Sequence, residues 1–279
     1  MADPAPHPVA PPHAVCALEA TCPLAPTIVK ARWLQQHLWD QDLQVVDTRA
    51  ASLYRRGHVP GALRLDLSAL QTTVEGVRGQ VVNPPEAEAL FRAAGLQRTA
   101  RIVVYGAETT TAPARLVWTL EYLGHRQVSL LDGGFAAWQQ DGGTLESAAR
   151  TPPRSEYAIE TVASQRRVSA ASVLASLSDG SMNLVDARSP AEFAAGHIPG
   201  ALNVDWTRNL AGGSLRPQAE LSSPYLSLDR TIPVATYCQT GSRASVAYVV
   251  LRALGFADVR LYDGSWAEWG SRPELPRVP

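Results

Sequence analysis

Short apolar runs alternate with longer amphipathic segments from about residue 28 to the end of the chain. The runs that end at Asp47 and Asp186 are almost continuously apolar, as expected of strands buried on both faces of a parallel sheet. Between residues 246 and 254, apolar residues recur with helical spacing, and Gly255 follows where a helix would stop. Strand and helix in this order predict an α/β fold, in which helices flank a mainly parallel sheet.

This pattern occurs twice, and the two copies also match residue by residue. Residues 45–66 read VVDTRAASLYRRGHVPGALRLD, and residues 184–205 read LVDARSPAEFAAGHIPGALNVD. Further along, residues 101–138 read RIVVYGAETTTAPARLVWTLEYLGHRQVSLLDGGFAAW, and residues 232–269 read IPVATYCQTGSRASVAYVVLRALGFADVRLYDGSWAEW. An internal repeat of this length indicates two tandem domains of one fold.

The repeat also sets the expected domain boundaries. We assign residues 27–145 to the first domain, residues 146–163 to a linker and residues 164–279 to the second domain. The prolines and polar residues of the linker favour an exposed connection. Residues 1–26 hold seven of the 21 prolines and are predicted to be a disordered leader. These prolines hinder a compact metal site, so no metal is expected on the leader's candidate ligands, His7, His13, Cys16 and Cys22.

Composition excludes several classes of function. The net charge of −1 argues against binding to nucleic acid or to an anionic membrane, although a small anion needs only local positive charge. No apolar run approaches the roughly 20 residues of a membrane-spanning helix. The leader lacks the basic and apolar regions of a secretory signal, and three cysteines cannot make a disulfide framework. We therefore expect a cytoplasmic protein, monomeric by default because both domains lie on one chain.

One cysteine lies beyond residue 22, in a loop between a predicted strand and a predicted helix. The loop consists of Cys238, Gln239, Thr240, Gly241, Ser242 and Arg243. In such a loop, successive backbone N–H groups can point inward and bind an anion at the helix N-terminus. The amide dipoles, the helix dipole and the guanidinium all favour ionisation of the thiol, and a thiolate is a ready nucleophile.

The first copy provides an internal control for this loop. A cysteine at a strand end is often only a small buried apolar residue. The first copy, however, has Gly106 in place of Cys238, carries Glu108 in its loop and has no arginine at the loop's end. Because the loop chemistry changes together with the cysteine, we expect the second loop to be functional. His58 and His197 occur in both copies, so we expect them to be structural.

Together these motifs resemble the two-domain rhodanese family, the thiosulfate and 3-mercaptopyruvate sulfurtransferases. The resemblance covers the chain from about Ile28 onward. It is carried by the D-x-R…GH-[VI]-PGA signature in both copies, the DGG…W and DGS…W endings, and Cys238 in the second copy only. It implies two rhodanese-like domains with the active site between them, and a first domain that is structural.

The resemblance also implies a reaction and the roles of residues, without a cofactor. Cys238 would take a sulfane sulfur from a small anionic donor, hold it as a persulfide and pass it to a thiophilic acceptor, cyanide or a thiol. Arg188 matches the family's substrate-binding arginine, with Asp186 orienting it. The loop from Gln239 to Arg243 would bind the anionic sulfur, and Trp206 and Arg208 are candidates for lining the cleft.

The residues after the cysteine leave two donors open. Gln239 and Thr240 replace the basic residues of many thiosulfate enzymes, and CQTGSR does not match the mercaptopyruvate pattern either. Arg243 favours dianionic thiosulfate, while the Thr240 hydroxyl suits 3-mercaptopyruvate. Other readings are a non-catalytic sulfur-binding module and a cysteine phosphatase. The phosphatase loop has five residues between cysteine and arginine, whereas this loop has four.

Overall fold

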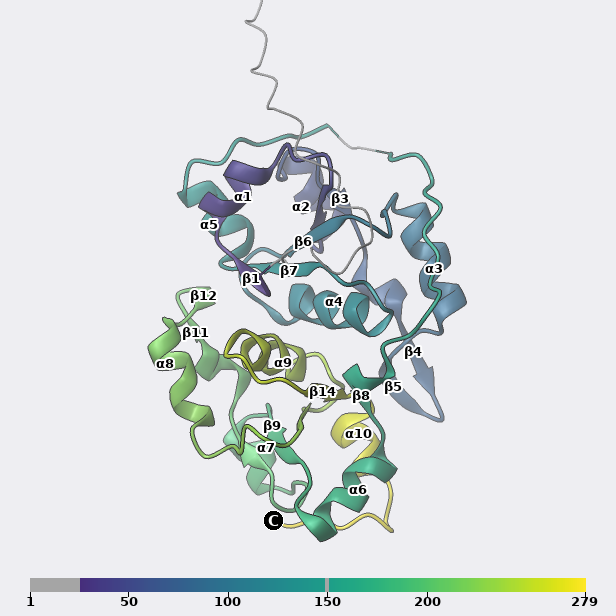
Figure 1. Cartoon of the computed structure of the whole chain (residues 1–279), viewed down its shortest axis with the longest axis vertical. Helices are drawn as coiled ribbons and strands as arrows, with labels where there is room; N and C mark the ends of the chain where they lie inside the picture. The colour runs from purple at the N-terminus through teal and green to yellow at the C-terminus, as the bar shows by residue number, and fades with distance from the viewer. Residues whose placement is uncertain (1–25, 149–150) are drawn as a thin grey trace, which may run out of the picture.

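The computed structural model describes residues 26–148 and 151–279, which form two α/β domains (Figure 1). The leader's candidate ligands therefore lie outside the described residues. Each domain has a five-stranded, wholly parallel central sheet, with strand order β1-β7-β6-β2-β3 in domain 1 and β10-β9-β13-β14-β8 in domain 2. The same order in equivalent strands confirms the fold class expected from the repeat.

The elements of domain 1 follow the predicted alternation. Its sheet strands are β1 (Ile28–Val29), β2 (Leu43–Asp47), β3 (Leu63–Arg64), β6 (Arg101–Tyr105) and β7 (Val128–Leu131). Its helices are α1 (Ala31–His37), α2 (Ala51–Arg56), α3 (Pro84–Ala93), α4 (Thr111–Tyr122) and α5 (Gly134–Gln140), with a 3-10 turn, η1 (Leu67–Leu70). A separate antiparallel hairpin is formed by β4 (Gln71–Val74) and β5 (Val77–Val81).

Domain 2 repeats this arrangement. Its sheet strands are β8 (Arg167–Val168), β9 (Asn183–Asp186), β10 (Leu202–Asn203), β13 (Val234–Tyr237) and β14 (Val259–Tyr262). Its helices are α6 (Ala170–Asp179), α7 (Pro190–Ala194), α8 (Gln218–Ser222), α9 (Ala244–Ala253) and α10 (Ser265–Trp269), and its 3-10 turns are η2 (Ser164–Arg166), η3 (Trp206–Asn209) and η4 (Ser223–Tyr225). The second hairpin consists of β11 (Leu210–Ala211) and β12 (Ser214–Leu215).

The two domains meet through α4 and α9, which lie side by side at the boundary (Figure 1). Both helices are buried over most of their length, because each has its own sheet on one side and the opposite domain on the other. Apolar residues of both helices, such as Leu120 and Val250, belong to one continuous buried cluster. Tyr248 of α9 donates a hydrogen bond to Glu121 of α4 at 2.6 Å, and Arg252 forms an ion pair with the same carboxylate.

Each domain also extends its hairpin to the other domain. The backbone N–H of Val81, at the end of β5, donates to Asp263 of domain 2 at 3.0 Å. Reciprocally, the N–H of Leu215, at the end of β12, donates to Asp132 of domain 1 at 2.7 Å. These carboxylates are the aspartates of the DGS and DGG motifs, so the repeated motif fastens the domains together in both directions.

The segment between the domains is exposed or half-buried over most of residues 151–163, with Ser155 and Tyr157 buried. It runs along the outside of domain 1 on its way to domain 2 (Figure 1). Tyr157 is 1% exposed, packs edge-on against Phe91 and contacts His125 through its hydroxyl at 2.8 Å. Arg92 donates to the Tyr157 carbonyl at 2.6 Å. Tyr157 therefore anchors this segment to domain 1, together with hydrogen bonds from the linker backbone to Glu88, Arg92 and Tyr122.

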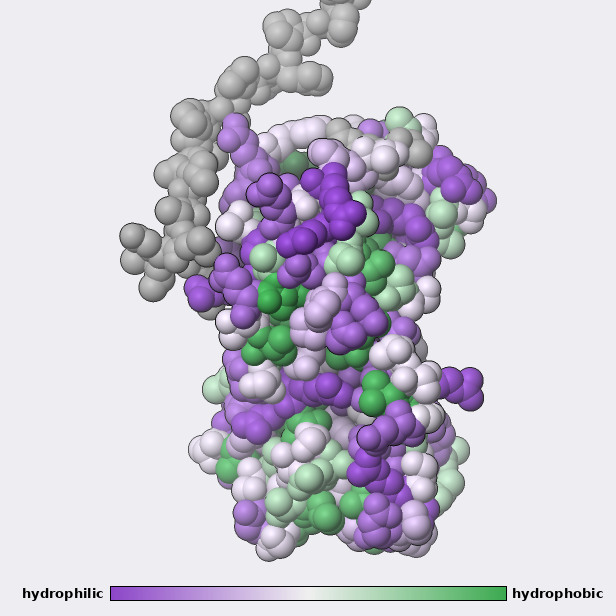
Figure 2. All heavy atoms as spheres, turned by 90° about the vertical axis from the view of Figure 1, so that its right-hand side faces the viewer, coloured by the Kyte–Doolittle hydropathy of each residue, from purple (hydrophilic) through white to green (hydrophobic). Residues whose placement is uncertain are grey.

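The surface on the side of α3 and the first hairpin is mixed, with apolar side chains in small groups among polar ones (Figure 2). Within the described residues, no helix combines the length and apolar character needed to cross a membrane.

Candidate active site

The candidate site lies at the carboxyl ends of the domain 2 strands. Asp186 ends β9, Cys238 directly follows β13, and Asp263 directly follows β14. These three strands are neighbours in the parallel sheet, so their ends lie together. This edge of an open α/β sheet is where ligands commonly bind.

The loop after β13 is held by its carbonyl groups. The carbonyls of Cys238 and Gln239 accept hydrogen bonds from the N–H groups of Trp266 and Ala267, both at 3.0 Å. By contrast, none of the backbone N–H groups from Gln239 to Arg243 donates a hydrogen bond to any residue that the structure describes. Gly241 has φ +83°, which lets the chain turn into α9. The loop therefore keeps a set of donors available, as an anion-binding loop requires.

Arg243 closes the loop, and its guanidinium forms a two-pronged ion pair with Glu192 of α7, at 2.7 and 2.8 Å. This hydrogen bonding is the main reason that the pKa of Arg243 is raised; burial opposes the rise, and interaction with Cys238 adds to it. The same pair, opposed by burial and helped by hydrogen bonds from Ser189, lowers the pKa of Glu192 to about 2. The ion pair is thus complete above the ordinary carboxylate range and is lost only as the pH falls toward about 2. Glu192 offsets part of the positive charge that the sequence assigns to this loop.

Glu192 was not among the residues expected at the site. It belongs to a capping box, in which Ser189 accepts from the Glu192 N–H while the Glu192 carboxylate accepts from the Ser189 N–H. The spacing S-P-A-E predicts such a cap, but it contains no signal that the glutamate also reaches Arg243, 51 residues along the chain.

Cys238 itself is 1% exposed and belongs to the buried apolar cluster. Burial alone fits a small apolar residue as well as a nucleophile. The available N–H groups and the neighbouring Arg243 distinguish this cysteine from ordinary core packing.

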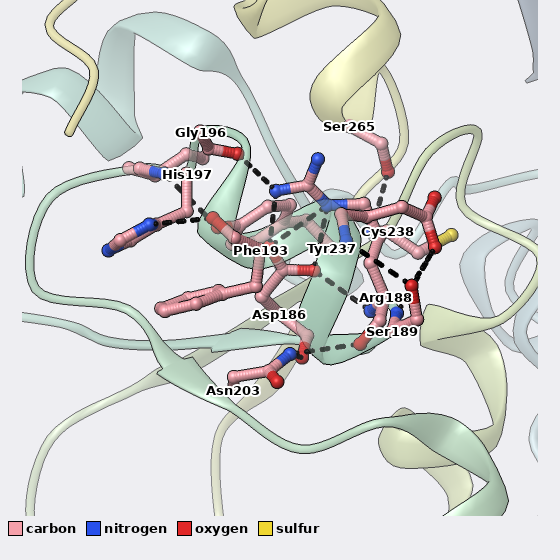
Figure 3. A network of polar contacts seen from close by, with 12 residues as sticks. Asp186, Arg188, Ser189, Phe193, Gly196, His197, Asn203, Tyr237, Cys238 and Ser265 are labelled. Carbon is pink, nitrogen blue, oxygen red and sulfur yellow. Dashed lines mark hydrogen bonds and ion pairs between the residues drawn. The ribbon is translucent and has the colours of Figure 1, made fainter. Parts of the chain in front are cut away.

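Arg188 is 2% exposed and is held by groups of its own domain (Figure 3). Its Nε and Nη2 donate to both oxygens of Asp186 at 2.6–3.0 Å, and Nη2 also donates to the Gly196 carbonyl at 2.7 Å. In domain 1, Arg49 makes the same contacts with Asp47 and the Gly57 carbonyl. These contacts therefore occur with or without the cysteine, and the donor-binding role of Arg188 stays a prediction.

His197 behaves like its counterpart in domain 1. Its Nδ1 contacts the Phe193 carbonyl at 3.0 Å, and its ring stacks on Phe193 with centroids 3.6 Å apart (Figure 3). His58 contacts the Tyr54 carbonyl and stacks on Tyr54 in the same way. The shared arrangement agrees with a structural role for both histidines.

The remaining predicted site residues are distributed around the loop. Gln239 is exposed, whereas Thr240, Ser242 and Arg243 are half-buried and Gly241 is buried. Trp206, on η3, is half-buried against the main cluster, and Arg208 on the same turn is exposed. Thr240 lies against Gly79 of the domain 1 hairpin, so a segment of the other domain covers this part of the loop.

Ser265 is a second residue that the sequence did not indicate. Its hydroxyl accepts a hydrogen bond from the Cys238 N–H at 3.3 Å and donates to the Tyr262 carbonyl at 2.8 Å. Its φ of +50° is unusual for a residue other than glycine, and domain 1 has Gly134 at this position with φ +55°. A strained residue that contacts a candidate nucleophile is often functional. The only sequence signal is the change from DGG to DGS between the copies.

Domain 1 retains the outline of a site without its nucleophile. A cavity of about 410 Å³ is lined by Arg49, Glu108 and Phe135, among others, where domain 2 has its cysteine loop. Gly106 replaces the cysteine and Glu108 supplies a negative charge, so this cavity cannot carry out chemistry at a thiol.

The comparison with known proteins agrees with this geometry. The family model for the rhodanese-like domain matches residues 30–141 and again residues 169–272. The chain belongs to the rhodanese family. Both copies of the repeat are therefore rhodanese-like domains, and only the second has a cysteine in its loop.

The relatives of this rhodanese include proteins named as two kinds of sulfurtransferase. A thiosulfate sulfurtransferase of Corynebacterium glutamicum is 36% identical over 270 residues, covering 89% of each chain. A 3-mercaptopyruvate sulfurtransferase of Escherichia coli K12 is 32% identical over 276 residues, covering 90% of this chain and 97% of the relative.

Two solved structures share the arrangement. The crystal structure of SseA from Escherichia coli, described as a 3-mercaptopyruvate sulfotransferase, superposes with a TM-score of 0.79 at 31% identity, covering 87% of this chain and 99% of SseA. A structure of EanB with ergothioneine has a TM-score of 0.80 at 22% identity, covering 91% of this chain and 70% of EanB, and shows the shared fold alone.

Proposed function

We propose that this protein is a thiosulfate sulfurtransferase that works through a persulfide on Cys238. The observation that carries the proposal is the loop from Gln239 to Arg243, whose N–H groups have no acceptor among the described residues, beside a cysteine of a rhodanese domain. Such a loop can stabilise both the Cys238 thiolate and the persulfide anion that forms when the thiolate accepts a second sulfur atom.

The reaction has two balanced halves. The Cys238 thiolate attacks the outer sulfur of thiosulfate, the sulfur–sulfur bond of the donor breaks, and sulfite leaves with the bonding electrons. The resulting persulfide anion lies against the loop N–H groups. A cyanide ion or a thiolate then attacks the terminal sulfur, and the Cys238 thiolate is released unchanged.

The choice of donor depends on the charge around the loop. Arg243 favours a dianionic donor such as thiosulfate, and the most identical relative named above is a thiosulfate enzyme. Glu192 reduces this preference, because it shares the guanidinium. 3-Mercaptopyruvate is the second candidate, supported by the half-buried Thr240 hydroxyl and by the relative from Escherichia coli. Steady-state rates with both donors, measured side by side, decide between them.

Residues around the loop would complete the site. We assign to Arg188 a contact with the charged end of the donor through Nη1, the nitrogen that its Asp186 and Gly196 contacts leave free. Trp206 and Arg208 would line the approach to the cleft. We further propose that the protein acts as a cytoplasmic monomer, since both walls of the site come from one chain.

Mass spectrometry tests the proposal directly. Thiosulfate should add the mass of one sulfur atom to Cys238 and release sulfite, and cyanide should restore the original mass while forming thiocyanate. Cys238→Ser should fold normally and form no thiocyanate, because the hydroxyl is a much weaker nucleophile. Thiocyanate formation by this variant, or an unchanged mass in the parent protein with both donors, would refute the assignment.

A phosphatase assay tests the main alternative chemistry. The four residues between Cys238 and Arg243 make a tight loop for a tetrahedral oxyanion, so we expect no turnover of p-nitrophenyl phosphate. Measurable hydrolysis that disappears in Cys238→Ser would favour a cysteine phosphatase.

A further inference from the structure

Arg115 lies on α4 of domain 1, yet its guanidinium contacts groups around the cysteine loop of domain 2. The side chain is 0% exposed. Its Nη2 forms an ion pair with Asp263 of domain 2 and donates to the Gly79 carbonyl at 3.0 Å. Trp118 stacks beneath the guanidinium, 4.3 Å from its ring centroid, and fixes its position.

Two nitrogens of this guanidinium, Nε and Nη1, have no hydrogen-bond partner among the described residues. Nη1 points at the loop: a Cβ built on Gly241 would lie only 2.6 Å from it. The guanidinium therefore occupies the space in which a side chain at position 241 would have to fit. Leaving buried donors unpaired is costly, so the arrangement calls for an explanation beyond packing.

In domain 1, none of the arginines that the structure describes in the other domain lies between the loop and the aspartate, and a side chain of the loop itself contacts the aspartate. Counted from the strand end, Thr109 stands where domain 2 has Gly241, although the first loop is one residue longer, and Asp132 is the counterpart of Asp263. In domain 1 the Thr109 hydroxyl donates to Asp132 at 2.8 Å, so the loop is tied to the aspartate by its own side chain. In domain 2 the glycine has no side chain, and Arg115 of the other domain makes the contact with the aspartate instead.

We propose that Arg115 is a positioning residue for the Cys238 loop, and that position 241 is glycine in order to admit it. The inference rests on the proposed sulfur transfer and deepens it. A contact internal to the first domain has been replaced in the second by a contact between domains. The loop consequently takes its reactive shape only when domain 1 is docked, and a buried cation lies beneath it at Gly241.

The first experiment separates positioning from a merely structural ion pair. Arg252 is the control, because it also forms an ion pair between the domains, with a partly buried guanidinium, but it lies near the far end of α9 from the loop. We expect Arg115→Met to lower kcat for sulfur transfer about tenfold or more with a smaller change in KM, since small displacements of reacting groups cost rate steeply. Arg252→Met should unfold more readily than the parent protein but keep kcat within about twofold. Arg115→Lys should recover part of the lost rate.

The second experiment uses the glycine and does not require removal of a buried charge. Gly241→Ala and Gly255→Ala both place an alanine at nearly the same backbone angle, φ +83° and +82°. Only the first meets Arg115; the nearest atom to the second is 3.5 Å away, on Arg230. We expect Gly241→Ala to lose activity and Gly255→Ala to keep it.

A double-mutant cycle joins the two residues. If Gly241 is glycine because of Arg115, Gly241→Ala should cost less activity in an Arg115→Ala background than in the parent protein. The double variant should therefore lose less activity than the product of the two single losses predicts. Independent, fully multiplicative losses would overturn the inference, as would equal activities of Gly241→Ala and Gly255→Ala.

These outcomes are distinct from failure of the proposed function. The rate at which iodoacetamide alkylates Cys238 requires no sulfur donor, and we expect Arg115→Met and Gly241→Ala to change it while Arg252→Met does not. If the parent protein forms no persulfide, the sulfurtransferase assignment fails. If it forms one and Arg115→Met matches Arg252→Met in kcat and alkylation rate, only the positioning role fails.

Discussion

The residues that hold Cys238 in place are as informative as the cysteine itself. Ser265 keeps a left-handed backbone conformation that its counterpart Gly134 adopts without strain. Unlike glycine, Ser265 has a hydroxyl, which accepts a hydrogen bond from the Cys238 N–H. Domain 2 therefore accepts local strain at the point where domain 1 has no nucleophile to hold.

Two substitutions of Ser265 separate the cost of the backbone strain from the effect of the hydroxyl on activity. Ser265→Gly and Ser265→Ala both remove the hydroxyl, but only glycine relieves the backbone strain. We expect the glycine variant to be about 1 kcal/mol more stable than the alanine variant. Both should transfer sulfur more slowly than the parent protein. Denaturant unfolding and initial rates check the two halves; full activity in either variant would remove Ser265 from the site.

Arg188 poses a different question, because Arg49 repeats its contacts in a domain without a cysteine. We expect Arg49→Ala and Arg188→Ala each to lose about 3–5 kcal/mol of stability, since each leaves a buried aspartate without its partner. Donor binding adds a second expectation, a higher KM for thiosulfate in Arg188→Ala alone. An equal KM in both variants, measured at a temperature where both are folded, would leave Arg188 with a structural role only.

At the scale of elements, the sequence predicted the repeated strands, the helix that ends near Gly255 and the loop that carries Cys238. These features are local, and the repeat supplied a comparison for each. The contacts that complete the site are not local. Ser265 reaches Cys238 from 27 residues away and Glu192 reaches Arg243 from 51, and no spacing in the sequence records such contacts.

The hairpin of β4 and β5 was not predicted either, because its strands are short, and the apolar Val77 and Val81 on one face of β5 do not indicate that their partner lies in the other domain. Its Gly79 lies against Thr240 of the cysteine loop. Because Gly79 contacts the loop through its lack of a side chain, the contact cannot be predicted from the pattern of apolar positions in the sequence.

Two glycines of this hairpin allow a controlled test of its role. Gly76 and Gly79 have similar backbone angles, φ +81° and +84°, but a Cβ at Gly76 meets nothing within 4 Å, whereas one at Gly79 would lie 3.1 Å from Thr240. Both alanine variants should lose about 1 kcal/mol of stability from the backbone conformation. Only Gly79→Ala should also slow sulfur transfer, because it displaces the loop. Equal rates in the two variants would show that the hairpin does not act on the site.

At the scale of the whole molecule, the interface between the domains resembles the interior of one domain. The cluster that includes Leu120 and Val250 is continuous across the boundary, and the Glu121 carboxylate binds residues of the other domain. The reciprocal hairpins add hydrogen bonds to two further carboxylates, those of Asp132 and Asp263. Neither domain can leave the other without exposing apolar surface and unpaired charge together.

This interface predicts that the two domains unfold as one unit. Denaturant curves recorded by far-ultraviolet circular dichroism and by tryptophan fluorescence should coincide, since buried tryptophans such as Trp118 and Trp269 lie in different domains. Arg252→Met should shift both curves to lower denaturant concentration together, because it leaves Glu121 short of a partner at the interface. Two separated transitions, or a variant that shifts one probe alone, would mean that the domains are only docked. In that case the coupling of the Cys238 loop to domain 1 would depend on a docking equilibrium and would weaken with temperature before either domain unfolds.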